Sequence, residues 1–292
     1  MLKFKANAFS KLFFENISQF LQFSFATKNF LNLTTRNEFS RYYSSSINNF
    51  DKYTSKNYEE QTIEVTEIIQ KNESLKILDV GTGCGTEAIW FALNKARVTS
   101  IDVKTKRLKV ALARKNFLED KFSLKLDLEF LNSDFFEFHK NYDSELFDVI
   151  WLEQAYHHIE PREKLIPALR DLLKDNGYLI FSEANGLNPF LQIRLFIYRA
   201  IGFKSIFKGY KTVDTWINSR GDEQLYGIER ITRKSTLKKS LRKNNFAIKS
   251  EKFFRVLPNK TYLRLFNFLE KLPSSFFPFL FSRYNIVCKK LG

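Results

Sequence analysis

The stretch Ile77-Leu78-Asp79-Val80-Gly81-Thr82-Gly83-Cys84-Gly85 decides the fold. Its apolar start predicts a short buried strand, and the three alternate glycines predict a sharp turn into a helix. Glycine has no Cβ, so the backbone can turn tightly and approach a ligand closely. A helix that starts behind such a turn presents free N–H groups and a partial positive charge. We therefore expect a ligand-binding loop at the carboxyl end of a strand.

The details of this loop indicate which ligand it binds. Thr86 follows Gly85, so the pattern is GxGxG and not the GxGxxG of dinucleotide-binding proteins. The GxxxxGK[ST] pattern of a P-loop is also absent. Asp79 ends the strand, where its carboxylate would repel a pyrophosphate and attract an ammonium group. This favours a cofactor that contains an amino acid.

Two further acids follow the next two predicted strands. Asp102 lies 23 residues after Asp79, about where dinucleotide-binding folds place the acid that accepts ribose hydroxyls. Asp134 ends the following strand and precedes Phe135, so a carboxylate and a ring would be available for an adenine amino group and base. Each acid alone would be read as a helix cap or a solvated turn residue. Three acids at successive strand ends make a chance arrangement improbable.

In this order and spacing, residues 60–185 resemble the class I S-adenosylmethionine (SAM)-dependent methyltransferases. The resemblance implies an α/β fold: a doubly wound, mostly parallel, seven-stranded Rossmann-like sheet with its last strand antiparallel, plus a helical cap. It implies SAM as the cofactor and no metal. The cofactor-binding residues that it implies are Asp79, Gly81, Thr82, Gly83, Gly85, Asp102, Val103, Asp134, Phe135 and Leu152.

Alternating strand and helix patterns extend from residue 60 and predict parallel β-α-β units. We expect strands at 76–80, 97–103, 126–134, 147–155, 178–184, 246–257 and 282–290. We expect helices at 61–71, 86–94, 106–117, 162–174 and 234–243. Asn176-Gly177 is typical of a helix end.

The segment Phe147–Ile159 should end beside the transferred methyl group, at the carboxyl edge of the sheet. It supplies three candidate catalytic residues: Glu153, His157 and His158. Histidine titrates near neutral pH, so either ring could act as a base, and either could instead pack or cap a helix. The segment lacks the Asn/Asp-Pro-Pro-aromatic motif typical of nucleic-acid amino methylation. It is similar to the corresponding region of small-molecule and quinone methyltransferases.

Residues 1–59 read as an N-terminal extension. Residues 1–45 are basic, contain serine and are poor in acids, which resembles a mitochondrial transit peptide, with residues 1–43 as the segment that would be removed. We favour an N-terminal cap that closes over the cofactor, in a cytoplasmic protein, with mitochondrial import as the alternative. The two cysteines, Cys84 and Cys288, suggest neither a disulfide framework nor a metal motif.

The remaining chain divides into an inserted cap at 186–232 and a C-terminal part at 233–292, with an apolar insert at 258–281. The formal charge of +15 lies entirely in this last third, because residues 1–185 carry −1 and residues 186–292 carry +16. A one-sided basic surface indicates an anionic partner. Basic and aromatic residues together suit an anionic membrane surface, or single-stranded RNA.

Three functions follow for this chain. The leading one is methyl transfer to an oxygen or carbon of a small, hydrophobic or lipid-like acceptor, with peripheral membrane contact and without nucleic acid. The second is methylation of RNA or protein by the basic C-terminal face. The third is a SAM-binding assembly factor without activity. The first predicts an apolar pocket above the methyl group, and the second an open basic cleft.

Overall fold

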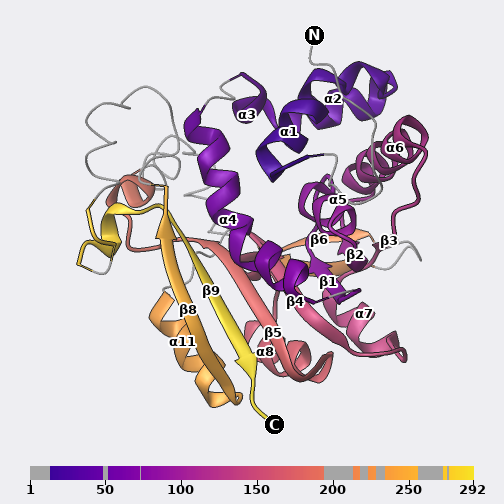
Figure 1. The fold of residues 1–292 in the computed structure, drawn as a ribbon. Helices are drawn as coiled ribbons and strands as arrows, with labels where there is room; N and C mark the ends of the chain where they lie inside the picture. Colours follow the sequence, from indigo (N-terminus) through magenta and orange to yellow (C-terminus); the bar gives the residue numbers. More distant parts are fainter. Residues whose placement is uncertain are drawn as a thin grey trace.

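A computed structural model describes residues 14–48, 52–72, 74–193, 213–217, 223–227, 234–255, 272–274 and 276–292. Its main element is a seven-stranded sheet with the strand order β3-β2-β1-β4-β5-β9-β8 (Figure 1). The strands are β1 (Lys76–Val80), β2 (Arg97–Asp102), β3 (Leu128–Asn132), β4 (Phe147–Glu153), β5 (Leu173–Ala184), β8 (Phe246–Phe254) and β9 (Arg283–Lys290).

The direction of the strands confirms the predicted sheet. Strands β1 to β5 pair in parallel with their neighbours, and β9 pairs antiparallel with both β5 and β8. The last strand in the sequence is therefore the reversed one. The carboxyl ends of β1, β2, β3, β4 and β5 consequently meet at one edge of the sheet, and every predicted site residue lies at or near this edge.

The sheet separates two apolar cores because successive side chains of a strand point to opposite faces. In β4, Trp151 belongs to one core and Leu152 to the other. The first core is covered by α4 (Lys52–Lys71), α5 (Thr86–Leu93) and α6 (Thr105–Phe122). The second is covered by α7 (Phe135–Asn141), α8 (Arg162–Asp171) and α11 (Lys234–Lys243), so the fold has three layers (Figure 1).

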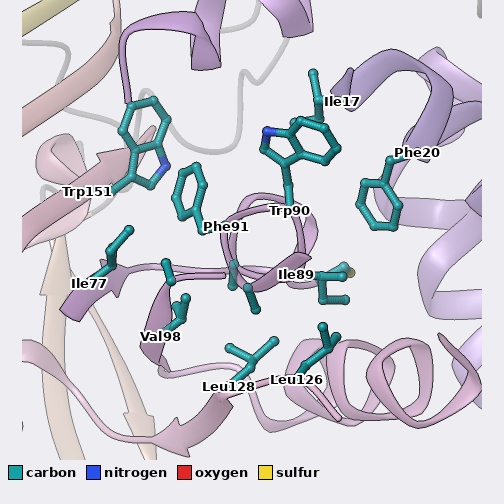
Figure 2. Close-up of a cluster of buried hydrophobic side chains, with 14 of the residues drawn as sticks. Ile17, Phe20, Ile77, Ile89, Trp90, Phe91, Val98, Leu126, Leu128 and Trp151 are labelled. Atoms are coloured by element: carbon teal, nitrogen blue, oxygen red, sulfur yellow. The ribbon is translucent and has the colours of Figure 1, made fainter. Parts of the chain in front are cut away.

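Three N-terminal helices extend the first core: α1 (Ile17–Ala26), α2 (Leu33–Tyr42) and α3 (Ser44–Asn48), with a short 3-10 helix, η1 (Lys28–Phe30), between the first two. Ile17 and Phe20 of α1 are buried and approach Trp90 of α5 (Figure 2). The rings of Phe20 and Trp90 stack with their centroids 6.4 Å apart. The N-terminal helices are thus part of the same core as the sheet.

A buried arginine, Arg114 of α6, ties these helices to the loop after β1. Its guanidinium donates to the carbonyl of Cys84 at 2.5 Å and to the Thr86 hydroxyl at 2.9 Å. The rings of Phe20 and Phe39 lie 5.6 and 5.1 Å from its central carbon. A buried cation is tolerated where it is hydrogen-bonded and faces aromatic rings, and both conditions hold here.

Several expectations about element boundaries are wrong. The predicted helix 162–174 ends at Asp171, since Leu173 already pairs with Phe147 in the sheet. Asn176, at φ 63°, lies in an irregularity of β5 and does not end a helix. The insert at 186–232, for which no clean strand was expected, contains the antiparallel hairpin β6 (Val213–Ile217) and β7 (Glu223–Gly227). Much of that insert and of the apolar insert at 258–281 lies outside the described residues.

Two short 3-10 helices complete the described elements: η2 (Tyr156–His158) after β4 and η4 (Pro278–Leu280) before β9. Within the described parts of the chain, no helix combines the length and the apolar character needed to span a membrane.

We expect Arg114→Met to destabilise the protein by roughly 1–3 kcal/mol, because it leaves the buried carbonyl of Cys84 without this donor and removes one hydrogen bond of the Thr86 hydroxyl. Urea unfolding followed by circular dichroism measures the change. Lys109→Met, at an exposed position of the same helix, is the matched control. Equal unfolding midpoints for the two variants would contradict this account of the N-terminal packing.

Candidate active site

The glycines after β1 hold backbone conformations that other residues rarely adopt. Gly81, Gly83 and Gly85 have φ values of 81°, 56° and 76°. A Cβ at Gly81 would lie 2.6 Å from the Cβ of Ala155, and one at Gly83 would lie 2.5 Å from the hydroxyl of Tyr42. The first glycine therefore allows the segment after β4 to approach the loop, and the second allows α2 to do so.

The loop is fixed to the end of β2. The N–H groups of Gly81 and Thr82 donate to the carbonyl of Ile101 at 2.9 and 3.1 Å. The N–H of Gly83 donates to one carboxylate oxygen of Asp102 at 2.8 Å, and Lys104 N–H donates to the other at 2.7 Å. Each carboxylate oxygen can accept more than one hydrogen bond, so Asp102 keeps capacity for ribose hydroxyls.

Asp134 caps α7, and it also keeps an unused oxygen. Its Oδ1 accepts from the N–H groups of Phe136 and Glu137 at 2.8 and 3.0 Å. Its Oδ2 is buried and has no hydrogen-bond partner within the described part of the chain. A buried acceptor without a donor is costly, so this oxygen fits an amino group of a bound base. Phe135 is buried and packs against Phe136 and His139.

Three acids converge where the methionine end of the cofactor is expected. Burial raises the pKa of Asp79 to about 7, and Asp102 and Glu153 add to the rise. Burial raises the pKa of Glu87, in the first turn of α5, to about 8, and Glu153 and Asp79 again contribute. Sequence reasoning missed Glu87, although it lies two residues after the last glycine. Such a cluster favours a ligand that carries positive charge.

A chain of polar contacts connects these acids to distant segments. Arg283 of β9 forms an ion pair with Glu153 at the end of β4 and donates to Gln61 of α4 at 3.2 Å. Gln61 in turn donates to Glu87 at 3.1 Å. Glu153 is thus held by a cation, which reduces its suitability as a base. It remains close enough to the loop to influence Asp79.

The segment after β4 contains a histidine–carboxylate pair. His157 Nδ1 lies 2.7 Å from Oε2 of Glu183, at the end of β5, and both side chains are buried. The other oxygen, Oε1, accepts the N–H of Tyr156 at 2.9 Å. Arg162 donates to the carbonyl of His157 at 2.9 Å and so fixes the backbone there. Sequence reasoning found His157 but not Glu183, whose only signal was its position at a strand end.

The remaining candidate residues lie close by. His158 is half-buried, and its ring centroid is 4.1 Å from that of His157. Leu152 is fully buried in the second core, whereas Val103, just after β2, is half-buried. The hairpin strand β7 contacts η2, which carries both histidines. No group of three side chains suited to a metal ion occurs among the residues that the structure describes.

The sheet order, the glycine loop and the acids at the strand ends define the class I SAM-binding methyltransferase fold. The glycine cradle, the unused oxygen of Asp134 and the acid cluster all fit a cationic adenosyl amino acid. Residues 71–252 match the family described as "Methyltransferase domain", and the chain belongs to this family. Its cofactor is SAM.

Similar proteins extend this comparison. Ubiquinone biosynthesis O-methyltransferase of Pasteurella multocida is 35% identical over 116 residues, which are 38% of this chain and 46% of that protein. The protein of the same name from Vibrio atlanticus is 28% identical over 144 residues, 48% of this chain and 56% of that protein. The chain thus spans about half the length of the curated relatives it matches.

Solved structures support the fold. A SAM-dependent methyltransferase of Methanosarcina mazei is 18% identical, with a TM-score of 0.51 over 77% of this chain and 97% of that one. The magnesium protoporphyrin IX methyltransferase of Synechocystis, crystallised with SAM, is 14% identical, with a TM-score of 0.52 over 94% and 97% of the two chains. At these identities the likeness concerns the fold alone.

The acid cluster predicts an unusual pH dependence of stability. A carboxyl whose pKa rises from 4.5 to about 8 on folding binds more protons in the folded state, so it lowers stability as the pH rises through that range. We therefore expect Glu87→Gln to leave stability nearly unchanged near pH 4 and to increase it progressively up to pH 8, by roughly 1 kcal/mol or more. Unfolding in urea at several pH values, without cofactor, measures this.

Glu129→Gln, at an exposed position of β3, is the control for that experiment. A stability difference between Glu87→Gln and the unmodified protein that does not change with pH would show that folding does not raise the pKa of Glu87.

Proposed function

We propose that the protein transfers a methyl group from SAM to an oxygen, or an activated carbon, of a small hydrophobic acceptor. The observation that carries the proposal is the buried pair of His157 and Glu183 beside the cofactor loop. Ala155, two residues before His157, lies against Gly81 of that loop. A base at this position is within the region where an acceptor meets the methyl group.

The tautomer of His157 determines what it can do. SAM, when bound, supplies a methyl group on a positively charged sulfur. With Nδ1–H directed at Glu183, the ring carries its lone pair on Nε2, the arrangement of a general base. His157 would take the proton from an acceptor hydroxyl through Nε2 while the hydroxyl oxygen gains nucleophilic character. The Glu183 carboxylate would stabilise the imidazolium that forms. Hydroxyl and phenolic acceptors need such a base, because they lose a proton during transfer.

The names of the similar proteins support an acceptor of this kind, since those relatives are ubiquinone biosynthesis O-methyltransferases. A quinone precursor with a long chain would be poorly soluble in water. Hydroxyl groups on such a ring would need the base that His157 provides. We therefore infer a phenolic or hydroquinone acceptor with an apolar substituent.

An exposed apolar surface borders the same edge of the sheet. It consists of Leu187, Phe190, Ile193, Phe276, Phe277 and Phe279, each at least 38% exposed. The buried side chains of Asn185 and Asn188 bind its two segments together, because they donate to the carbonyls of Pro278, Phe281, Phe279 and Leu280. The surface begins four residues after Glu183.

We propose that this apolar surface contacts an anionic membrane, helped by the basic charge of residues 186–292.

Methyl-labelled SAM tests the function. We expect label in the organic-soluble fraction when the protein is incubated with phenolic or hydroquinone compounds that carry alkyl chains, and with extracts of its source. His157→Asn should lower the transfer rate about 10²–10³-fold without changing SAM affinity, because a general base contributes about 10²–10⁴-fold. Glu183→Gln should have a similar effect, since the amide would donate to Nδ1 and so move the ring proton to Nε2.

Glu129→Gln, at an exposed position of β3, is the control and should transfer label like the unmodified protein. Nuclease- or protease-sensitive label in acid-precipitable material would instead support methylation of RNA or protein. Undiminished transfer by both His157→Asn and Glu183→Gln would remove the proposed base.

The apolar surface makes a separate prediction. Phe276→Ser combined with Phe279→Ser should lower the affinity for vesicles that contain anionic phospholipid about fivefold to tenfold, since each exposed ring would bury apolar area in the interface. Sedimentation with vesicles at low and high salt measures this. Leu112→Ser, an exposed apolar position on α6, should bind like the unmodified protein. Equal binding by the double variant would show that the surface does not meet the membrane.

A further inference from the structure

The N-terminal helices reach the cofactor loop at two points. The hydroxyl of Tyr43 hydrogen-bonds to the hydroxyl of Thr86, directly after the last glycine. Arg114 joins Thr86 and the carbonyl of Cys84 to the aromatic face of α1 and α2. These contacts hold α2 in a defined position relative to the loop. The side chain that precedes Tyr43 lies against the same loop.

That side chain is Tyr42, the last residue of α2. Its hydroxyl occupies the space that a Cβ on Gly83 would enter, 2.5 Å from that position. Its ring lies 4.9 Å from the guanidinium carbon of Arg107 and makes an edge contact with Tyr43 at 4.8 Å. The buried side of α2 carries Phe39 and Thr35, so Tyr42 stands at the border between packed core and cofactor loop.

The surroundings of Tyr42 are those of the cofactor site. Its hydroxyl lies within Coulombic range of the carboxylates of Glu87 and Glu153. Gly83, which it covers, donates its N–H to Asp102. Nevertheless residue Tyr42 as a whole is 38% exposed, although its neighbour Tyr43 is buried. An aromatic side chain that contacts a ligand-binding loop and is partly exposed offers area for a ligand to bury.

We propose that Tyr42 is a cofactor-binding residue, which closes the SAM site from above the glycine loop and slows release of the bound cofactor. The inference rests on SAM as the cofactor and is independent of the acceptor. Residue 42 lies outside the matched family region, 71–252, so this contact is an addition made by the N-terminal helices. It also requires that residues 14–43 remain in the mature protein, because cleavage after residue 43 would remove Tyr42.

Three variants test the contact. Tyr42→Ala should weaken binding of SAM and of S-adenosylhomocysteine about tenfold, chiefly through faster dissociation, as loss of a buried aromatic contact predicts. Tyr42→Phe keeps the ring and should bind within about threefold of the unmodified protein. Leu33→Ala, on the same helix at a position 66% exposed, is the matched control. Calorimetry gives the affinities, and stopped-flow tryptophan fluorescence gives the dissociation rates.

Stability measured without cofactor separates binding from packing. Tyr42→Ala and Leu33→Ala should unfold at similar urea concentrations, since each removes a partly exposed side chain. Affinity of Tyr42→Ala within twofold of the unmodified protein, with the fold intact, would overturn the proposal.

Limited trypsin digestion provides a second readout, which needs no variant. The Arg41 side chain is exposed, so trypsin can cleave the Arg41–Tyr42 bond, next to the proposed cofactor contact. Bound S-adenosylhomocysteine should slow cleavage there severalfold more than at Lys121, near the end of α6. Equal protection at the two sites would overturn the proposal, even if Tyr42→Ala failed to fold. The affinity and digestion experiments need no methyl acceptor. The proposal for Tyr42 and the proposed acceptor can therefore fail independently of each other.

Discussion

The register of β1 against β2 is the constraint on which the site depends. Val80 pairs with Ile101, so β2 extends one residue beyond β1, and the carbonyl of Ile101 and the carboxylate of Asp102 face the turning chain. The loop donates three N–H groups to these two acceptors, and its glycines supply the positive φ values that this requires. A register shifted by one residue would reverse the side chains of β1 and remove both acceptors. The positions of α5, Tyr42 and Ala155 all follow from this turn.

Much of this was predictable because its signals are local. The apolar strands, the glycine loop and the acids at the strand ends lie within short stretches, and strands β1, β4 and β9 begin within one residue of the prediction. The wrong expectation for Asn176-Gly177 has a local cause as well: a residue with positive φ can end a helix or interrupt a strand, and only the pairing of Leu173 with Phe147 decides between them.

The partners of the site residues were beyond sequence reasoning, because they come from distant segments. Glu183 is 26 residues from His157, and Arg283 is 130 residues from Glu153. An acid at a strand end or an arginine in a basic region has no periodic pattern that would reveal its partner. The choice of His157 as the proposed base therefore depends on the fold, which brings the end of β5 against η2 and places the Glu183 carboxylate at Nδ1 of His157.

The acids around the loop indicate how binding energy for the cofactor arises. Asp79 and Glu87 have raised pKa values because folding buries them beside each other and beside Glu153. Near neutral pH the folded protein without a ligand thus holds Glu87 mostly protonated and Asp79 partly protonated, while Glu153 forms an ion pair with Arg283. A ligand with an ammonium and a sulfonium would lower these pKa values and pair with the ionised carboxylates, whereas the product, with a neutral sulfur, would do so less.

That difference favours exchange of product for fresh cofactor. The proposed contact of Tyr42 would hold either ligand by its shape, and so would slow loss of SAM before transfer. In this proposal the matched family region supplies the carboxyl groups around the cofactor, and the N-terminal helices cover the cofactor. We propose that selection of the acceptor falls to the segments beyond β5, where the apolar surface and the hairpin strand in contact with η2 lie.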